Sequence, residues 1–285
     1  MSAISIFGLG YVGAVSLACL AENGHKVIGV DVNPLKADII NSGRSPIVEH
    51  GLQEMIQKGV ASGVIRATMD TREAILNTEI SFISVGTPSN SNGSLDLKYV
   101  ENVAREIGKA LLEKDAYHII ILRSTVLPGT TEELLIPVLE QESGKKCGVD
   151  FGVCFNPEFL RESTAIKDFY DPPFTVIGAA DEKVANVVQG LYSMLNAPLR
   201  IISIREAEMI KYACNAFHAL KVTFANEIGS ICKAGGIDSH KVMEIFCLDT
   251  KLNLSPYYLK PGYAFGGSCL PKDLRALTYL GRHFD

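Results

Sequence analysis

One cysteine of the sequence lies in a loop whose composition suits a nucleophile. Cys269 stands in the stretch Gly266-Gly-Ser-Cys-Leu-Pro-Lys-Asp273, with two glycines before it and a Lys/Asp pair after it. Glycines let a substrate carbon approach the sulfur, and Lys272 favours the thiolate, which is the attacking form. A single cysteine is more often an inert buried side chain. The loop favours the reactive alternative for Cys269, whereas the other six cysteines lie in apolar segments and are expected to be inert.

A second group of polar side chains lies along one predicted helix. Lys211, Asn215 and His218 follow the spacing i, i+4, i+7 and therefore share one face. Asn226 lies within about one further quadrant of that face. Amides and an imidazole favour a site over the solvated face that such stripes usually form. Cys214 and His218 have the spacing of metal ligands, but no second ligand pair lies nearby, so no metal site is predicted.

The N-terminal residues carry a dinucleotide-binding pattern. Gly8, Gly10 and Gly13 stand between a predicted strand and a predicted helix. The first glycine makes a tight turn, the second lets the backbone approach a pyrophosphate, and the third allows close helix–strand packing. Asp31 ends the next strand, where an acid accepts both ribose hydroxyls and repels a 2′-phosphate. The pattern favours NAD over NADP, and the alternative is a turn cluster with a solvated aspartate.

Three further polar segments follow predicted strands. Thr87 and Thr125 each come directly after an apolar run, at the edge where doubly wound sheets bind ligands. Each threonine is either a cofactor contact or a cap of the next helix. The acids of segment 156–165 either order water or substrate hydroxyls or lie exposed at a capped helix start. The residue pattern leaves both choices open.

The elements that must position these residues form an α/β pattern up to about residue 200. Short β-branched runs alternate with amphipathic stretches, which predicts a Rossmann-like, doubly wound, mostly parallel sheet. The predicted strands cover residues 4–7, 26–30, 80–85, 119–122, 149–154 and 174–178. The predicted helices cover residues 12–23, 34–42, 51–62, 97–112 and 132–141.

The character of the chain changes after residue 200. Residues 205–234 contain one glycine and no proline. They keep an apolar stripe at helical spacing, made of Ile210, Ala213, Phe217, Phe224, Ile228 and Ile231. We expect one long helix that founds a second, α-helical domain with a face for self-association. The predicted domains are therefore residues 1–200 and 201–285.

Composition and charge limit the partners. The 285 residues carry a net charge of −5 at a pI of about 5.7, which gives no basic field for nucleic acid or an anionic membrane. Seven scattered cysteines indicate a reducing cytoplasm rather than a disulfide scaffold. The apolar stretch 3–21 has no basic residue before it and is interrupted by glycines, so we expect a strand and turn there and not a signal or anchor.

Taken together, the ordered motifs resemble the UDP-glucose/GDP-mannose dehydrogenase family over the whole chain. They are Gly8-Leu-Gly-Tyr-Val-Gly13, Gly86-Thr-Pro88, Arg123-Ser-Thr-Val-Leu-Pro-Gly129, Asn156-Pro-Glu-Phe-Leu-Arg-Glu162, Lys211-Tyr-Ala-Cys-Asn215 and Gly266-Gly-Ser-Cys-Leu-Pro-Lys-Asp273. The resemblance implies oxidation of a sugar C6 alcohol to a carboxylate that consumes two NAD and releases no aldehyde.

The resemblance also implies residue roles. Cys269 would form a thiohemiacetal and then a thioester that water hydrolyses. Lys211 and Asn215 would stabilise developing oxyanions, while Asp273, Thr125 and Glu162 would order or activate the water. The positions that match the NAD side are Tyr11, Val12, Asp31, Lys36, Thr87, Thr125 and Lys272.

The expected substrate rests on two segments that resemble the GDP-mannose branch, whose products feed uronate polysaccharides such as alginate. The matching residues on the sugar side are Glu162, Glu208, Lys211, Asn215, His218, Asn226, Tyr257, Tyr258 and Lys260. Lys260 departs from that branch, which usually has an arginine reaching a neighbouring subunit's substrate. Because lysine lacks the bidentate fork of arginine, the contact is expected to be weaker. UDP-glucose is the alternative substrate.

The family continues with a further α/β domain that holds the nucleotide, and none of it is found in these residues. We therefore expect the chain to turn over its substrate very slowly. NAD binding and homodimer formation are still expected, because the residues argued for them are present. Two other classes stay open. A β-hydroxyacid dehydrogenase has a similar domain and helix but needs no cysteine. A module that binds NAD and dimerises would not catalyse at all.

Overall fold

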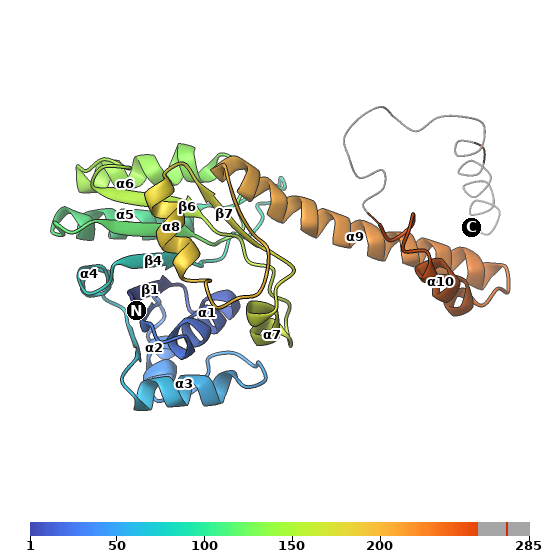
Figure 1. Ribbon diagram of the computed structural model, residues 1–285, viewed down its shortest axis with the longest axis horizontal. Coiled ribbons are helices and arrows are strands. Elements are labelled where there is room, and N and C mark those ends of the chain that lie inside the picture. Colours follow the sequence, from blue (N-terminus) through green and yellow to red (C-terminus); the bar gives the residue numbers. More distant parts are fainter. Residues whose placement is uncertain (256–271, 273–285) are drawn as a thin grey trace. The chain divides into compact units, whose positions relative to one another are not determined.

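A single eight-stranded sheet organises the first part of the chain (Figure 1). The computed structural model describes residues 1–255 and residue 272. The strand order is β3-β2-β1-β4-β5-β6-β7-β8, and every neighbouring pair is parallel except β6 and β7. The strands are β1 (Ala3–Phe7), β2 (Lys26–Val30), β3 (Ile65–Thr68), β4 (Ile80–Ile83), β5 (His118–Leu122), β6 (Phe151–Phe155), β7 (Thr175–Ala179) and β8 (Leu199–Ile202).

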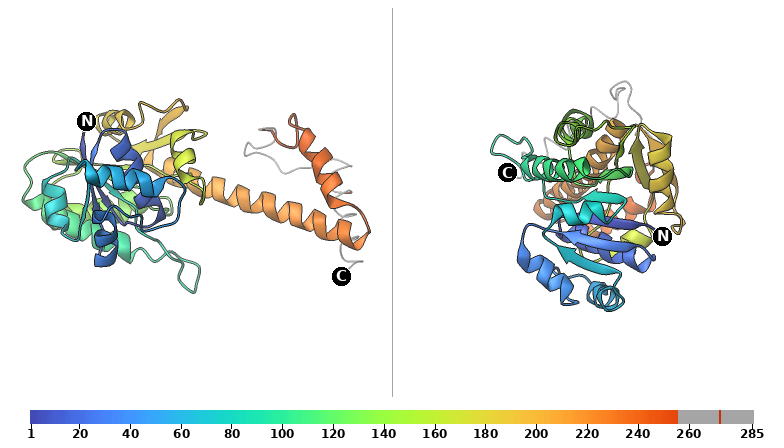
Figure 2. Two further views of the ribbon diagram at one scale, coloured as in Figure 1. Left: turned by 90° about the horizontal axis from the view of Figure 1, so that it is seen from below. Right: turned by 90° about the vertical axis from the view of Figure 1, so that its left-hand side faces the viewer.

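Helices cover both faces of this sheet, as Figure 2 shows for the part of the chain coloured blue to yellow. They are α1 (Tyr11–Glu22), α2 (Pro34–Asn41), α3 (Leu52–Ala61), α4 (Thr71–Leu76), α5 (Lys98–Leu112), α6 (Ile136–Ser143), α7 (Ala165–Tyr170) and α8 (Glu182–Gly190). A π-helical turn, Thr131–Leu135, leads into α6. Each face has its own apolar core, one built around α1 and the other around α5 and α6.

The sheet has a topological switch point at β1. The chain runs outward from β1 through β2 to β3, then returns to place β4 on the other side of β1. The crossovers on the two sides therefore diverge at the carboxyl ends of β1 and β4, which leaves a crevice where such sheets bind ligands. Gly8 and Ser84, the residues that follow Phe7 and Ile83, are placed at this edge.

The chain forms two compact units, Met1–Ala213 and Cys214–Asp285. Helix α9 (Ile204–Ala234) contributes to both, and α10 (Ser239–Leu248) belongs to the second. Asp238 caps α10 by accepting hydrogen bonds from the amides of His240 and Lys241. Among the described residues, no helix is both long and apolar enough to span a membrane.

The predicted fold class is confirmed, and most predicted elements are present. The predicted long helix 205–234 is a single helix, α9. The sequence prediction missed β3 and β8, which have four residues each, and the short helices α4, α7 and α8. The strands and the helices α4 and α7, with four to six residues, are too short for a periodic pattern to identify, but length does not explain why α8, with nine residues, was missed. The strand predicted over 149–154 begins later, because Gly148 to Asp150 form a turn before Phe151.

The apolar stripe of α9 is less buried than a core face would be. Phe217 is 42% exposed and Phe224 is 43% exposed. In contrast, Ile204 and Ala207, in the first turns of the helix, are buried against the sheet. The stripe predicted the helix correctly, but of its residues Ile210 packs against the core of the first unit, whereas Ala213, Phe217 and Phe224 are exposed.

A buried polar chain crosses the sheet near the amino ends of β1, β4 and β5. The Ser5 and Ser81 hydroxyls lie 2.7 Å apart, and Ser81 Oγ lies 2.7 Å from Nε2 of His118. His118 is fully buried. Burial lowers the pKa of His118 to about 3, and the nearby Lys114 ammonium lowers it further. His118 is therefore neutral in the fold at neutral pH.

Protonation of His118 in the unfolded chain gives a stability prediction. Below pH 6.5 the histidine is protonated in the unfolded chain but stays neutral in the folded one. The free energy of unfolding should therefore fall by about 1.4 kcal/mol for each pH unit below 6.5. The loss should be absent above pH 6.5. Urea unfolding of wild type and His118→Gln between pH 8 and pH 5 measures it. Equal slopes in both proteins would contradict the assignment to His118.

Candidate active site

The glycine loop between β1 and α1 has three glycines with three different environments. Gly8 has φ +93°, and a Cβ there would lie 2.8 Å from the Ser84 carbonyl oxygen. A Cβ at Gly13 would lie 1.8 Å from the Gly8 carbonyl oxygen. A Cβ at Gly10 would meet no atom of the described residues within 4 Å, and Gly10 precedes the first residue of α1. Gly10 therefore faces open space at a helix N-terminus, as a pyrophosphate seat requires.

Asp31 lies at the end of β2, where the sequence places the ribose-binding acid. Its carboxylate accepts hydrogen bonds from the Leu9 amide at 2.7 Å and the Asn33 amide at 2.9 Å, and it pairs with Lys36 at 3.1 Å. Asp31 and Lys36 line a cleft of about 400 Å³ with Gly8, Gly10 and apolar side chains that include Val30 and Val85. Asp31 is held by the amide of Leu9 in the glycine loop and lies in a cleft with apolar walls. Such a site fits the adenosine half of a dinucleotide.

A second cavity of about 280 Å³ continues along the same edge. The two cavities share Gly10 and residues 84–86. Thr87, Thr125 and Glu158 line the second one, together with Tyr11 and Val12. The Thr87 hydroxyl donates to the Thr125 carbonyl oxygen at 2.7 Å, which joins the two loops. All the cofactor residues predicted in the first unit line these two cavities except Gly13, which packs against the Gly8 carbonyl oxygen.

A buried ion pair stands at the far end of this crevice. Lys211 Nζ donates to the Glu158 carboxylate at 2.8 Å and to the Glu158 carbonyl oxygen at 2.6 Å. The Leu160 amide donates to the other carboxylate oxygen at 2.7 Å. Both side chains are about nine-tenths buried. The pair places an ammonium and a carboxylate in the part of the crevice that Thr125 lines. An ammonium can stabilise an oxyanion, and a carboxylate can accept or donate a proton.

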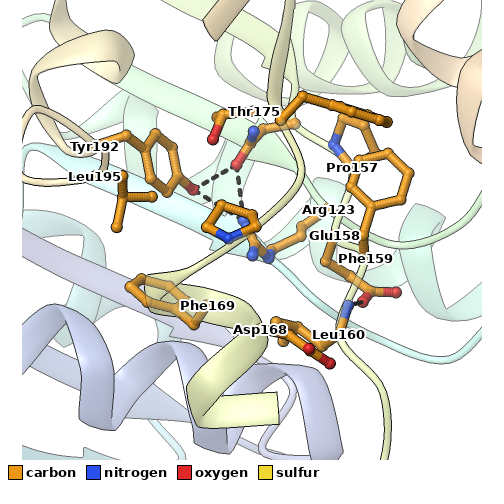
Figure 3. Close-up of a pocket in the computed structure, with 13 residues that line it drawn as sticks. Arg123, Pro157, Glu158, Phe159, Leu160, Asp168, Phe169, Thr175, Tyr192 and Leu195 are labelled. Carbon is orange, nitrogen blue, oxygen red and sulfur yellow. Dashed lines mark hydrogen bonds between the residues drawn. The ribbon is translucent and has the colours of Figure 1, made fainter. Parts of the chain in front are cut away.

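Behind this pair lies a buried arginine, Arg123, shown in Figure 3. Its Nη1 donates to Oδ1 of Asn156 at 2.7 Å and to the Tyr192 hydroxyl at 2.9 Å. The Asn156 amide in turn donates to the Val176 carbonyl oxygen at 2.7 Å. Because Asn156 is two residues before Glu158, this network fixes the segment that carries the carboxylate. Arg123 lines both the crevice and a small cavity behind it.

The structure distinguishes the two acids of segment 156–165, for which the residue pattern left open a role in the site or an exposed position. Glu158 is buried and bonded to Lys211, whereas Glu162 is exposed. The carboxylate with a lysine partner is thus Glu158, which the residue pattern left as one of two candidate acids and to which the family resemblance gave no role. Its position directly after a buried strand, between Pro157 and Phe159, was the available signal for burial.

Glu208 corrects another expectation. We expected it on the sugar side, but it is fully buried. Its carboxylate accepts hydrogen bonds from the Gly129 amide at 2.6 Å, the Thr131 amide at 2.9 Å and the Thr131 hydroxyl at 2.6 Å. Glu208 therefore anchors the loop after Thr125 to α9, and its full burial, with three hydrogen bonds inside the first unit, does not match the expected contact with a sugar.

The remaining predicted residues lie in the second unit or outside the described residues. Asn215, His218 and Asn226 are exposed on α9, and Lys272 is exposed. The predicted residues outside the described part of the chain are Cys269, Asp273, Tyr257, Tyr258 and Lys260. Among residues 1–255 and 272, no cluster of three metal-ligating side chains is found.

The sheet order, the glycine loop and the acid at the end of β2 define the class of dinucleotide-binding α/β proteins of the dehydrogenase type. Sequence comparison is more specific. The NAD binding domain of the UDP-glucose/GDP-mannose dehydrogenase family matches residues 2–196, and the central domain of that family matches residues 205–285. The chain belongs to this family.

Several relatives are closely similar. GDP-mannose 6-dehydrogenase of Pseudomonas syringae pv. tomato is 60% identical over 282 residues, which are 99% of this chain and 64% of the relative. A UDP-glucose 6-dehydrogenase of Haloferax volcanii is 40% identical and is covered to 65%. The crystal structure of a ternary complex of GDP-mannose dehydrogenase from Pseudomonas aeruginosa superimposes with a TM-score of 0.98 at 58% identity, over 99% of this chain and 65% of that one. The chain thus spans less than two thirds of these relatives.

Proposed function

We propose that this chain binds NAD and carries the chemistry that oxidises C6 of GDP-mannose to the carboxylate. The observation that carries the proposal is the continuous crevice, with Asp31 in its first part, Gly10 where the two cavities meet, and Glu158 with its partner Lys211 in its second part. Higher identity to GDP-mannose than to UDP-glucose dehydrogenases, 60% against 40%, favours the mannose nucleotide. UDP-glucose is the alternative substrate.

The proposed reaction assigns roles to residues of the crevice and to residues of the second unit. NAD, when bound, accepts one hydride in each of two oxidations. Lys211, with Asn215 one turn further along α9, stabilises the negative charge that develops on the sugar oxygen. Cys269 adds to the C6 aldehyde as a thiolate, and the thiohemiacetal loses the second hydride to become a thioester. Water then releases the carboxylate and the thiol, with Thr125, Asp273 and the acids Glu158 and Glu162 ordering that water or taking its proton.

Cofactor choice tests the adenosine end of the proposal. Asp31 should make NADH bind at least about tenfold more tightly than NADPH, because its carboxylate repels a 2′-phosphate. In Asp31→Asn this preference should shrink, because the charge is removed while the shape is kept and Lys36 loses its anionic partner. Titration of NADH and NADPH fluorescence measures both affinities, and Lys36→Met serves as the control for the lysine. If the wild-type protein bound NADPH as tightly as NADH, the assignment of Asp31 to the ribose would be contradicted.

Product analysis tests the cysteine and the substrate. Cys269→Ala should abolish carboxylate formation, because the thioester cannot form. Incubation with GDP-mannose or UDP-glucose, followed by mass analysis of the sugar nucleotide, separates the two substrates. Carboxylate formation by Cys269→Ala would favour a reaction of the β-hydroxyacid dehydrogenase type. If wild type binds NADH but oxidises neither sugar nucleotide, the cofactor-binding module without catalysis is favoured.

We also propose that the second unit mediates homodimer formation. The described part of that unit exposes a series of large apolar side chains on two helices. They are Phe217, Leu220, Val222 and Phe224 on α9 and Val242, Ile245 and Leu248 on α10. A second copy of the chain would remove these side chains from water. Sedimentation of the chain across a concentration series tests this, and a monomer at all concentrations would contradict it.

A further inference from the structure

The side chain of Tyr11 joins three segments that are far apart in the sequence. Its hydroxyl accepts a hydrogen bond from the Ser163 amide at 2.8 Å and donates one to the Glu49 carboxylate. Glu49 is 8% exposed and lies in the loop between α2 and α3. Tyr11 is also the first residue of α1, next to Gly10 in the crevice. Tyr11 thus lines the cofactor crevice, while its hydroxyl contacts Glu49 and Ser163, which line neither of the two cavities.

Ser163 belongs to a loop with an unusual backbone. It is the one non-glycine residue of the described chain with a positive φ, at +72°. Asp168 holds both ends of this loop, because it accepts hydrogen bonds from the Arg161 amide at 2.9 Å and the Thr164 hydroxyl at 3.0 Å. The Tyr11 hydroxyl holds the middle of the loop. A left-handed serine persists only where such contacts over-determine it.

Glu49 sets the direction of the hydrogen bonds. A phenol has one proton to donate and lone pairs to accept with. Burial, followed by the hydrogen bond to Glu49, raises the pKa of Tyr11 to about 12, so the phenol keeps its proton at neutral pH. Because that proton points to Glu49, a lone pair is left for the Ser163 amide.

We propose that Tyr11 is a positioning residue that couples the cofactor seat to the loop 161–164, with Glu49 orienting its hydroxyl. Glu162 is the exposed carboxylate in this loop and directly precedes Ser163, whose amide the Tyr11 hydroxyl binds. Ordering the Gly10–Tyr11 backbone by a dinucleotide also orders the phenol, which then restrains Ser163 and with it Glu162. The coupling rests on the proposed function, because it takes the start of α1 as the NAD seat.

Amide hydrogen exchange of Ser163 in the full 285-residue chain tests the proposal. Without cofactor, this amide should exchange at least about tenfold faster in Tyr11→Phe than in wild type, because its acceptor is gone. Glu49→Gln should stay close to wild type, since an amide oxygen also accepts from a phenol, whereas Glu49→Leu should exchange faster. Tyr170→Phe is the matched control, because it removes a phenol hydroxyl that bonds to the Cys19 carbonyl oxygen and to Asn23 rather than to this loop.

Saturating NADH provides the second arm. It should slow Ser163 exchange further in wild type and in Glu49→Gln, but not in Tyr11→Phe that has been shown to bind NADH. Equal exchange of Ser163 in wild type and Tyr11→Phe without cofactor would overturn the positioning role. Equal protection by NADH in both proteins would overturn the coupling. If wild type binds no NADH, the proposed function fails, and the comparison without cofactor still decides the positioning role.

Discussion

Gly10→Ala is expected to fold with the wild-type midpoint of thermal unfolding and to bind NADH about 10- to 100-fold more weakly, a loss of about 1.4 to 2.7 kcal/mol. The added methyl meets no atom of the described residues within 4 Å, so it does not disturb the fold. It does fill the space at the start of α1 that the diphosphate needs. NADH fluorescence titration and a thermal melt measure the two quantities on one preparation.

Gly13→Ala is the matched variant, with the same added atom and a different reason for its effect. A methyl there would lie 1.8 Å from the Gly8 carbonyl oxygen, so α1 and the glycine loop must move apart. We expect it to lose stability, by about 1 to 3 kcal/mol for an overpacked site, as well as NADH affinity. Wild-type NADH affinity in Gly10→Ala would show that the crevice at α1 does not hold the diphosphate. A lowered melting temperature of Gly10→Ala would show that its glycine serves packing.

These glycines were predictable because their pattern is local. A strand, a tight turn and a helix follow one another between Ala3 and Glu22, and Asp31 directly follows the next strand, so spacing alone predicts the site. The crevice could also be placed in advance, because parallel strands bring their carboxyl ends to one edge. Thr87 and Thr125 lie at that edge for this reason.

The roles of the acids were not predictable, because they depend on contacts that are distant in sequence. Lys211 reaches Glu158 across 53 residues, and Glu208 reaches the Gly129 amide across 79. Glu158 and Glu162 stand in the same polar segment, so composition cannot tell which one turns inward. Likewise, Glu49 has no motif of its own, and only the fold brings it to the Tyr11 hydroxyl.

Variants of the Lys211–Glu158 pair should separate its contribution to stability from its contribution to the reaction. Lys211→Met leaves the Glu158 carboxylate buried without its cation, and Glu158→Gln leaves the Lys211 ammonium without its anion. Each single change should cost about 3–5 kcal/mol of unfolding free energy, which is typical when one partner of a buried pair is removed. The double variant removes both charges, so its loss should be much smaller than the sum of the single losses. Urea unfolding of the four proteins measures this cycle.

Turnover of GDP-mannose by the same four proteins gives the decisive comparison. If Lys211 stabilises a developing oxyanion, Lys211→Met should lower kcat by about 10²- to 10³-fold, as removal of such a donor does elsewhere. The double variant should regain most of its stability and none of this activity, because a methionine cannot neutralise an oxyanion. Recovery of turnover together with stability would show that Lys211 only holds Glu158 and the loop around it in place. Additive single losses of stability would show instead that the two charges do not depend on one another.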